Sequence, residues 1–154
     1  MNTLFIFLAE YLTYVLSLYA VLHVLFKHER RYYLRHIFSI FGFAVIAWGV
    51  ARVVKNIIAH PRPDLTQALI IPDSVYSFPS GHATYAMALA VAMYTFDKKA
   101  GSILILGALL VGLGRVLVGV HYWYDVIGGF IVGAVVAYIA VRLAAYIRTK
   151  YKIF

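Results

Sequence analysis

Residues 4–26 have the sequence LFIFLAEYLTYVLSLYAVLHVLF, an apolar run whose single carboxylate is Glu10. A helix needs about 20 mainly apolar residues to cross roughly 30 Å of hydrocarbon, so this segment is long enough to span a membrane. No small-residue cleavage site follows it, and we therefore interpret it as a retained helix rather than a signal peptide.

Further segments of the same character follow along the chain: Ile37–Ile58, Ser80–Phe96, Ala100–Leu117 and Tyr122–Tyr146. The composition agrees, because 64% of the 154 residues are hydrophobic and only 13% are charged. A soluble domain is usually about 45–50% apolar and about 25% charged. We predict a single all-α domain over residues 1–154, a polytopic membrane bundle of about five transmembrane helices.

One stretch outside these segments stands out, from Ala59 to Pro79. It contains all four prolines of the chain. Proline removes a backbone donor and restricts the residue before it, so we expect an irregular loop at a membrane surface here.

The positions of the cations predict the orientation. Lysine and arginine concentrate in cytoplasmic connections. They cluster in the first connection, in the third connection and at the C-terminus: Lys27, Arg30, Arg31, Arg35, Lys98, Lys99, Arg148, Lys150 and Lys152. With five spans these regions share one side, so we expect an integral protein of a bacterial inner membrane with its N-terminus outside and its C-terminus cytoplasmic. The net charge of +8 does not indicate a nucleic-acid partner, because the cations lie at the ends of apolar runs.

Three cations on the expected outer side break this rule: Lys55, Arg62 and Arg115. They belong to three short blocks. The blocks are KNIIAHPRP at residues 55–63, PSGH at 79–82 and GRVLVGVHYWYD at 114–125. The five-span topology alone brings all three blocks to one membrane face.

Phosphoryl transfer mainly requires positioning of the phosphate and stabilisation of charge on its oxygens. Lys55 and two arginines supply cations, and arginine binds phosphate in a bidentate manner. Ser80 and Gly81 open a helix, whose free N–H groups and dipole favour an anion. We predict that Lys55, Arg62, Ser80, Gly81 and Arg115 bind a phosphate.

Two histidines complete a catalytic set. A neutral imidazole can attack phosphorus and form a phosphohistidine, and we assign this role to His121. Asp125 lies four residues later and can hold one ring N–H, while His82 can protonate the leaving oxygen and then activate water. The outer acids Asp64, Asp73 and Asp125 are scattered in the sequence, so we expect neither a metal ion nor another cofactor.

Other polar or glycine residues have simpler interpretations. His23, His28 and His36 are expected to be structural, and His60 to lie near the site without contacting substrate. Arg52 either extends the cationic patch or pairs with an acid, and Glu10 is either functional or the partner of Arg52. The aromatic residues 122–124 suit an interfacial belt, and Gly129 and Gly133 suit close packing of helices, within one chain or between chains.

The three blocks resemble the signature motifs of the type 2 phosphatidic acid phosphatase (PAP2) superfamily, and the resemblance covers roughly residues 52–133. It implies a helical core with a phosphate pocket at the helix ends and a phosphohistidine mechanism. It assigns the same roles to His121, Asp125 and His82 as the chemistry above, and the same phosphate-binding residues. Two features depart from the family pattern: Gly114 stands where the third motif has serine, and five spans replace the common six.

The function predicted from these features is hydrolysis of a lipid phosphate or diphosphate, with membrane lipids as the other partners. Undecaprenyl diphosphate, phosphatidylglycerophosphate, phosphatidic acid and the anomeric phosphate of lipid A remain alternative substrates. A different class of function is a binding or transport protein that recognises lipid phosphate without hydrolysing it. A relative of the vanadium haloperoxidases would use a similar pocket, but those proteins are soluble and much larger. The sequence does not indicate the oligomeric state.

Overall fold

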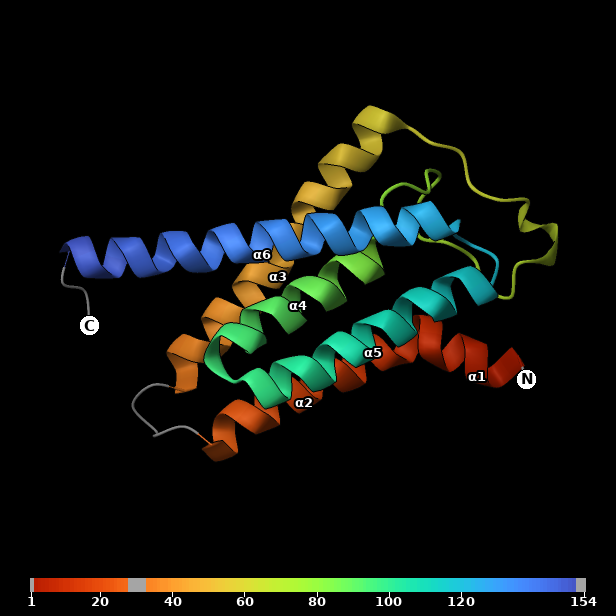
Figure 1. Cartoon of the computed structure of the whole chain (residues 1–154). Helices are drawn as coiled ribbons and strands as arrows, with labels where there is room; N and C mark the ends of the chain where they lie inside the picture. Colours follow the sequence, from red (N-terminus) through yellow and green to blue (C-terminus); the bar gives the residue numbers. More distant parts are fainter. Residues whose placement is uncertain (1, 28–32, 152–154) are drawn as a thin grey trace.

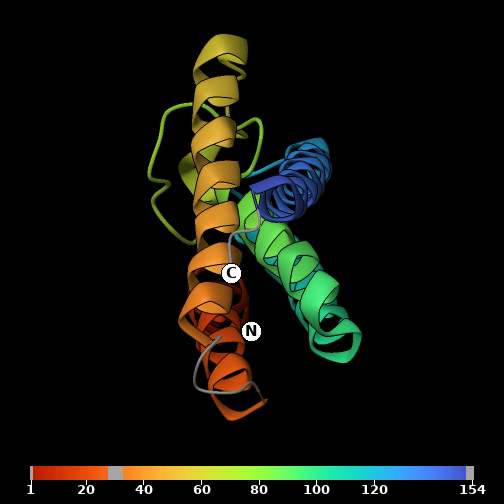
Figure 2. The ribbon, with the colours of Figure 1, turned by 90° about the vertical axis from the view of Figure 1, so that its left-hand side faces the viewer.

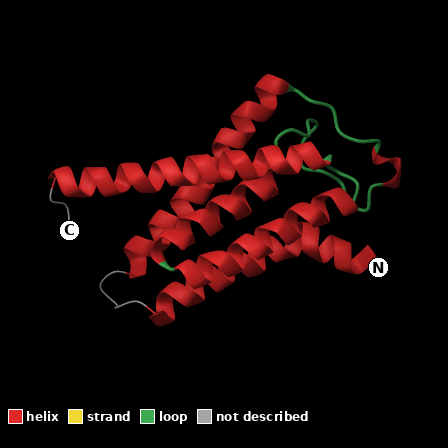
Figure 3. Ribbon diagram, viewed as in Figure 1, coloured by secondary structure: helices red, strands yellow, loops and turns green. Residues whose placement is uncertain are grey.

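The computed structural model describes residues 2–27 and 33–151, with the side chain of Tyr33 excepted. All regular structure within these ranges is helical (Figure 3). The elements are α1 (Asn2–Ile6), the π-helix η1 (Phe7–Tyr11), α2 (Leu12–Lys27), α3 (Tyr33–Ile58), the 3-10 turn η2 (Leu65–Gln67), α4 (Gly81–Phe96), α5 (Lys98–Leu117) and α6 (Trp123–Tyr151). The prediction of an all-α bundle is confirmed.

Four helical rods in the described part of the chain are long and apolar enough to cross a membrane: Asn2–Lys27, Leu34–Ile58, Lys98–Leu117 and Trp123–Tyr151. The first combines α1, η1 and α2 without a break. The remaining predicted span forms the helix α4, which has 16 residues and is shorter than a typical span. The structure therefore contains the five predicted helices, with α4 the shortest.

Helix α4 lies at the centre of the bundle and packs against α3, α5 and α6. It is apolar on every side and rich in alanine, and a helix hydrophobic all round is a buried helix. The approach to α6 is close, because a Cβ added at Gly133 would lie 2.3 Å from the Thr84 carbonyl oxygen. A Cβ at Gly129 would lie 2.7 Å from the Ser80 carbonyl oxygen. The predicted glycine packing is confirmed, and it occurs within the chain.

The two ends of the bundle differ (Figure 1). The N-terminus, the loop between α3 and α4, and the α5–α6 connection lie at one end. The C-terminus and the α4–α5 connection lie at the other. Figure 2 shows α3 along one side of the molecule and α6 across from it, and α4 contacts both of these helices.

Asp97 joins the elements at the end that carries the C-terminus. Its Oδ1 accepts the backbone N–H groups of Lys99 and Ala100, which caps α5. Its Oδ2 pairs with Lys27 and lies 3.1 Å from His23 Nε2, which fixes the end of α2 to the start of α5. The hydrogen bond from Lys27 is the largest of the effects that hold the pKa of Asp97 well below its usual range. The structural role predicted for His23 is confirmed, whereas His28 lies outside the described residues.

The proline-containing loop is irregular except for η2, as predicted. It folds back over the end of the bundle through hydrogen bonds of Leu69 N–H to Val118 O (3.0 Å) and of Ser77 N–H to His60 O (2.8 Å). Gly119 adopts φ +81° where this loop meets the end of α5, a conformation that glycine adopts without strain. The loop is thereby held against the residues that follow α5.

Candidate active site

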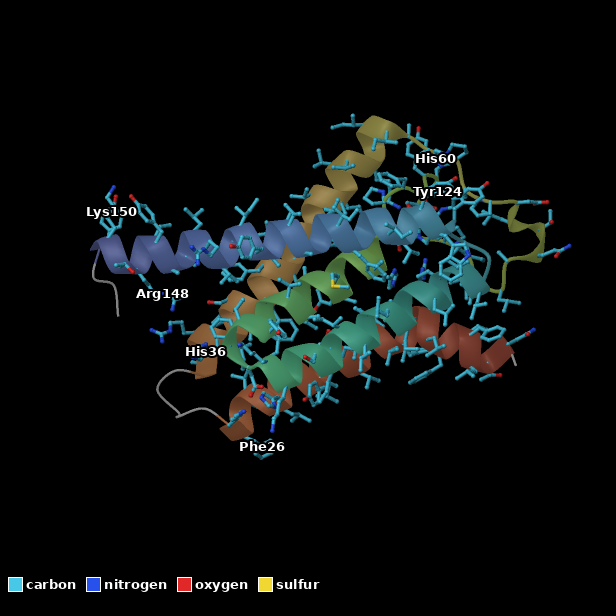
Figure 4. The ribbon with its side chains drawn as sticks, viewed as in Figure 1. Phe26, His36, His60, Tyr124, Arg148 and Lys150 are labelled. Carbon is cyan, nitrogen blue, oxygen red and sulfur yellow. The ribbon has the colours of Figure 1, made fainter. Side chains whose placement is uncertain are left out.

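The three sequence blocks meet at the end of the bundle that carries the loop. Lys55 comes from the end of α3, Ser80 from the N-cap of α4, Arg115 from the last turn of α5, and His121 from the connection to α6. In Figure 4, His60 and Tyr124 lie at this end, whereas Phe26, His36, Arg148 and Lys150 lie at the other. The convergence predicted from topology is therefore present in the structure.

His121 and Asp125 form a buried pair at the start of α6. The distance from His121 Nδ1 to Asp125 Oδ2 is 3.3 Å. Asp125 is fully buried, and it also accepts the Tyr122 N–H at 2.9 Å and the Ser77 hydroxyl at 3.3 Å. These donors hold the carboxylate in one orientation, so that its hydrogen bond to Nδ1 leaves His121 Nε2 with a lone pair.

The electrostatic surroundings keep His121 neutral. Burial lowers its pKa from the ordinary value of 6.5 to about 4, and the charges of Arg115, Arg62 and Lys55 act in the same direction. The hydrogen bond with Asp125 opposes this shift without cancelling it. A neutral ring is the form that can act as a nucleophile.

Arg62 lies on the other side of the His121 ring. Its Nη1 is 3.5 Å from His121 Nε2 and donates to the Val120 carbonyl at 2.7 Å. Its Nε donates to the Ser74 carbonyl at 2.7 Å, and its Nη2 donates to the Ser74 hydroxyl at 2.9 Å. Arg62 therefore links the loop, through Ser74, to the connection that carries His121. Its positive charge lies beside His121 Nε2.

Lys55 is almost completely buried, and its Nζ donates to the carbonyl oxygens of Tyr76 and Ser77 at 3.0 Å each. An ammonium group has three protons, so one donor remains for an anion. Lys55 thus positions the end of the loop and contributes a cation to the site.

The N-terminus of α4 supplies polar groups without protein partners. Ser80 is fully buried, and its Oγ has no hydrogen-bond partner among the described residues. The Ser80 N–H, which we expected to face an anion, instead donates to the Asp125 carbonyl at 3.0 Å. The N–H groups of Gly81 and His82 lie in the first turn, where a helix has no internal acceptors for them. The expectation of N–H donors therefore applies to these two residues and not to Ser80.

Arg115 is the largest fully buried side chain among the described residues. Its Nη1 forms an ion pair with Glu10, and its Nε is buried without a hydrogen-bond partner in the described part of the chain. Arg52 instead pairs with Asp73 at 3.1 Å and stacks on Trp48. The hypothesis that Glu10 is the partner of Arg52 is therefore wrong, since each has a different partner.

His82 borders a cavity of about 300 Å³ between α2, α3 and α4. Most of its lining is apolar or aromatic, and the lining residues are Thr13, Tyr14, Ser17, Val45, Trp48, Gly81, His82 and Tyr85. An apolar space beside a polar cluster suits a ligand with an anionic head and an apolar tail. Among residues 2–27 and 33–151, no three acidic, histidine or cysteine side chains form a group able to hold a metal ion.

Some contributing residues were not identified from the sequence. Ser77 is fully buried, and its Oγ lies within hydrogen-bond distance of the Pro61 carbonyl (2.8 Å), Asp125 Oδ1 (3.3 Å) and His60 Nδ1 (3.1 Å). No motif marks this serine, because its role follows from the loop conformation. His60, which we did expect near the site, packs edge-on against the stacked rings of Tyr122 and Tyr124, and its Nδ1 also contacts the Pro61 carbonyl.

The sequence comparisons agree with this fold and site. The PAP2 superfamily model matches residues 33–149, and the chain belongs to this superfamily. It is 33% identical over 108 residues to undecaprenyl-diphosphatase BcrC of Bacillus subtilis, a match that covers 65% of this chain and 56% of that protein. It is 34% identical over 149 residues to an undecaprenyl-diphosphatase of Sulfolobus acidocaldarius, covering 93% of this chain and 70% of the relative.

Solved structures agree as well. A transmembrane PAP2 type phosphatidylglycerolphosphate phosphatase from Bacillus subtilis superposes with a TM-score of 0.66 at 26% identity. That alignment covers 96% of this chain and 76% of the other. Aquifex aeolicus LpxE gives a TM-score of 0.61 at 24% identity over 91% of this chain and 93% of its own, and it supports the fold alone.

Proposed function

We propose that the protein is an integral-membrane phosphatase that hydrolyses a lipid phosphate or diphosphate through a phosphohistidine on His121. The observation that carries this proposal is the pairing of His121 Nδ1 with buried Asp125 while Nε2 faces the positive charge of Arg62. Ser80 Oγ and Arg115 Nε are two buried donors that have no hydrogen-bond partner in the described part of the chain, and they lie in the second and third blocks. Hydrogen-bond donors that the fold holds in fixed positions can bind the phosphate oxygens, which carry the negative charge of the transition state.

The reaction proceeds in two displacements. His121 Nε2 forms a bond to phosphorus as the bond from phosphorus to the leaving oxygen of the lipid breaks. In a diphosphate this is the bridging oxygen, so a lipid monophosphate leaves. His82, in its protonated form, donates a proton to that oxygen. His82 then takes a proton from water, whose oxygen attacks phosphorus, and the phosphorus–nitrogen bond breaks to release inorganic phosphate. Lys55, Arg62 and Arg115 balance the charge on the phosphoryl oxygens in both steps. No step in this scheme requires a metal ion.

The proposed substrate is a membrane lipid with an apolar tail. The cavity beside His82 supports this choice, because its lining is mainly apolar and it lies next to the acid–base residue. Among the four lipids considered, we favour undecaprenyl diphosphate, since undecaprenyl-diphosphatases are among the most similar relatives. The experiment described below compares it directly with phosphatidylglycerophosphate, phosphatidic acid and lipid A.

The proposed orientation places the active site outside the cytoplasm. The described cations away from the site, including Lys27, Lys98 and Arg148, lie at the opposite end of the bundle. Because lysine and arginine favour the cytoplasmic side, that end is assigned to the cytoplasm.

The proposal is tested by phosphate release from the four lipids in detergent micelles, with purified wild-type protein and His121→Ala. We expect release that is sensitive to vanadate and insensitive to EDTA, and none from the variant. An active His121→Ala protein would contradict the assigned nucleophile. Stoichiometric binding of a lipid without turnover by the wild-type protein would instead favour a binding or transport protein.

A further inference from the structure

Glu10 is an acidic side chain at the site that the mechanism above does not use. It lies in the π-helical segment η1, about one-third exposed, and it forms an ion pair with Nη1 of the buried Arg115. π-helical turns are rare and occur frequently at functional sites.

The geometry of Arg115 indicates what this carboxylate does. A guanidinium has two edges that can bind an anion in a bidentate manner, Nη1–Nη2 and Nε–Nη2. Glu10 accepts a hydrogen bond from Nη1 of Arg115. Nε is buried without a partner, and no hydrogen bond from Nη2 is found among the described residues. The Nε–Nη2 edge therefore remains free for two oxygens of a phosphate.

The close approach of η1 to Arg115 depends on the residue before it. A Cβ at Gly114 would lie 2.6 Å from the Ala9 backbone nitrogen and 2.7 Å from the Leu8 carbonyl carbon. Both neighbours are backbone atoms, so any side chain at this position would push η1 away from α5. The glycine that replaces the serine of the family motif thus permits the contact that brings Glu10 to Arg115.

We propose that Glu10 is a positioning residue of the phosphate site, and that it acts with Gly114 to hold Arg115 so that the Nε–Nη2 edge faces the substrate phosphate. This inference deepens the function proposed above and rests on it for the identity of the substrate. A simple alternative is that Glu10 competes with phosphate for Arg115. The two ideas predict opposite effects of removing the side chain.

Glu10→Ala and Glu10→Gln separate these ideas. Alanine removes both the acceptor and the charge, whereas glutamine keeps an oxygen that can accept from Nη1. The probe is inorganic phosphate, measured by calorimetric titration of the detergent-solubilised protein. We expect affinity in Glu10→Ala to fall about tenfold or more, because Arg115 loses the charged hydrogen-bond partner that orients it. We expect Glu10→Gln to bind phosphate at least as tightly as the wild-type protein. Tighter or unchanged binding by Glu10→Ala would overturn the proposal.

Gly114→Ala provides the second arm, with Gly107→Ala as its matched control. Both glycines lie on α5 against the helical segment Asn2–Lys27, but the three atoms nearest a Cβ at Gly107 belong to the flexible side chain of Leu16 and not to backbone. We expect Gly114→Ala to weaken phosphate binding as Glu10→Ala does, and the double variant to be no weaker than either one, because both changes remove one contact. Gly107→Ala should bind phosphate like the wild-type protein. If Gly114→Ala does not fold, the pair of Glu10 variants decides the question.

Measuring lipid hydrolysis alongside phosphate binding distinguishes a failure of the proposed role of Glu10 from a failure of the proposed function. If the wild-type protein binds phosphate but releases none from any lipid, while Glu10→Ala binds more weakly, the proposed hydrolysis fails and the role of Glu10 stands. If lipid is hydrolysed and the Glu10→Ala protein matches the wild-type protein in KM, kcat and phosphate affinity, the role of Glu10 fails and the hydrolysis stands.

Discussion

At the residue scale, His121 depends on an acid that is held by several donors at once. Asp125 accepts from the Tyr122 N–H and the Ser77 hydroxyl as well as facing His121 Nδ1. The backbone carbonyl of the same residue accepts from Ser80 N–H, which ties the start of α6 to the start of α4. The ring of His121 is therefore oriented by the packing of two helices and not by one contact alone.

Asp125→Asn tests this orientation. The amide keeps the size of the carboxylate but can present an N–H to Nδ1, which favours the tautomer whose proton sits on Nε2. We expect kcat for lipid phosphate release to fall about 10²–10⁴-fold, by analogy with the loss when a catalytic triad loses its acid. A circular dichroism spectrum like that of the wild-type protein would show that the fold is kept. Wild-type turnover in Asp125→Asn would contradict the assigned role.

The titration of His121 gives a second prediction at this scale. Burial and nearby cations lower its pKa to about 4, so the ring should stay neutral from pH 8 down to about pH 5. Nuclear magnetic resonance of ring-labelled histidine in micelles, without phosphate, should show the His121 signal unchanged over this range. The signal is assigned by its absence in His121→Ala. A midpoint near 6.5 would contradict the prediction.

The same shift has a consequence for stability. The folded-state pKa lies below the ordinary value of 6.5, so the unfolded chain binds more protons between about pH 6.5 and 4. The contribution of His121 to the free energy of unfolding is therefore complete above this window and declines as the pH falls through it.

At the element scale, the helices and their order could be predicted from the sequence, because a span needs a long apolar run. The predicted start of the helix at Ser80 is off by one residue, since Ser80 is its N-cap, and the predicted final span ends before the observed Tyr151. The loop from Ala59 to Pro79 could be predicted as irregular from its prolines. Its path could not, because it depends on contacts such as that of Ser77 with Asp125, which no local pattern specifies.

The site could be predicted as a set of residues but not as a set of contacts. Spacing and topology predicted the histidines, the acid and the cations, and their roles stay a prediction. The partner of Arg115 could not be identified, because Glu10 lies far away in the sequence and reaches it only through the close packing at Gly114. Sequence patterns report on neighbours along one element, whereas this pair depends on how two helices approach.

The contact of α4 with α6 gives the prediction at the element scale. A Cβ at Gly133 would lie 2.3 Å from the Thr84 carbonyl oxygen, which is backbone and cannot rotate away. We expect Gly133→Ala to lower the free energy of unfolding by about 1–3 kcal/mol, the usual cost of overpacking. Thermal unfolding in detergent measures this. Gly49→Ala is the control, since a Cβ there meets nothing within 4 Å. Equal stability of the two variants would contradict the proposed packing.

At the scale of the whole molecule, the two ends of the bundle are specialised. One end holds the site and the folded-back loop, and the other holds the Asp97 junction and the C-terminus. The central helix α4 links them, because its first turn belongs to the site and its last residue precedes Asp97. The proposed reaction at a membrane surface needs the first of these ends to face the compartment where the lipid phosphate lies.

The orientation of the molecule in the membrane can be measured directly, because the chain has no cysteine that would interfere. Gln67→Cys places a thiol in the exposed loop at the site end, and Lys99→Cys places one at the exposed start of α5 at the other end. The asymmetry of the cations predicts that a membrane-impermeant maleimide added to intact spheroplasts labels Gln67→Cys, while Lys99→Cys reacts only after permeabilisation. The reverse labelling pattern would contradict the proposed orientation and place the site in the cytoplasm. It would not affect the assignment of His121, because the chemistry depends on the contacts among the three blocks. The orientation decides only which leaflet supplies the lipid.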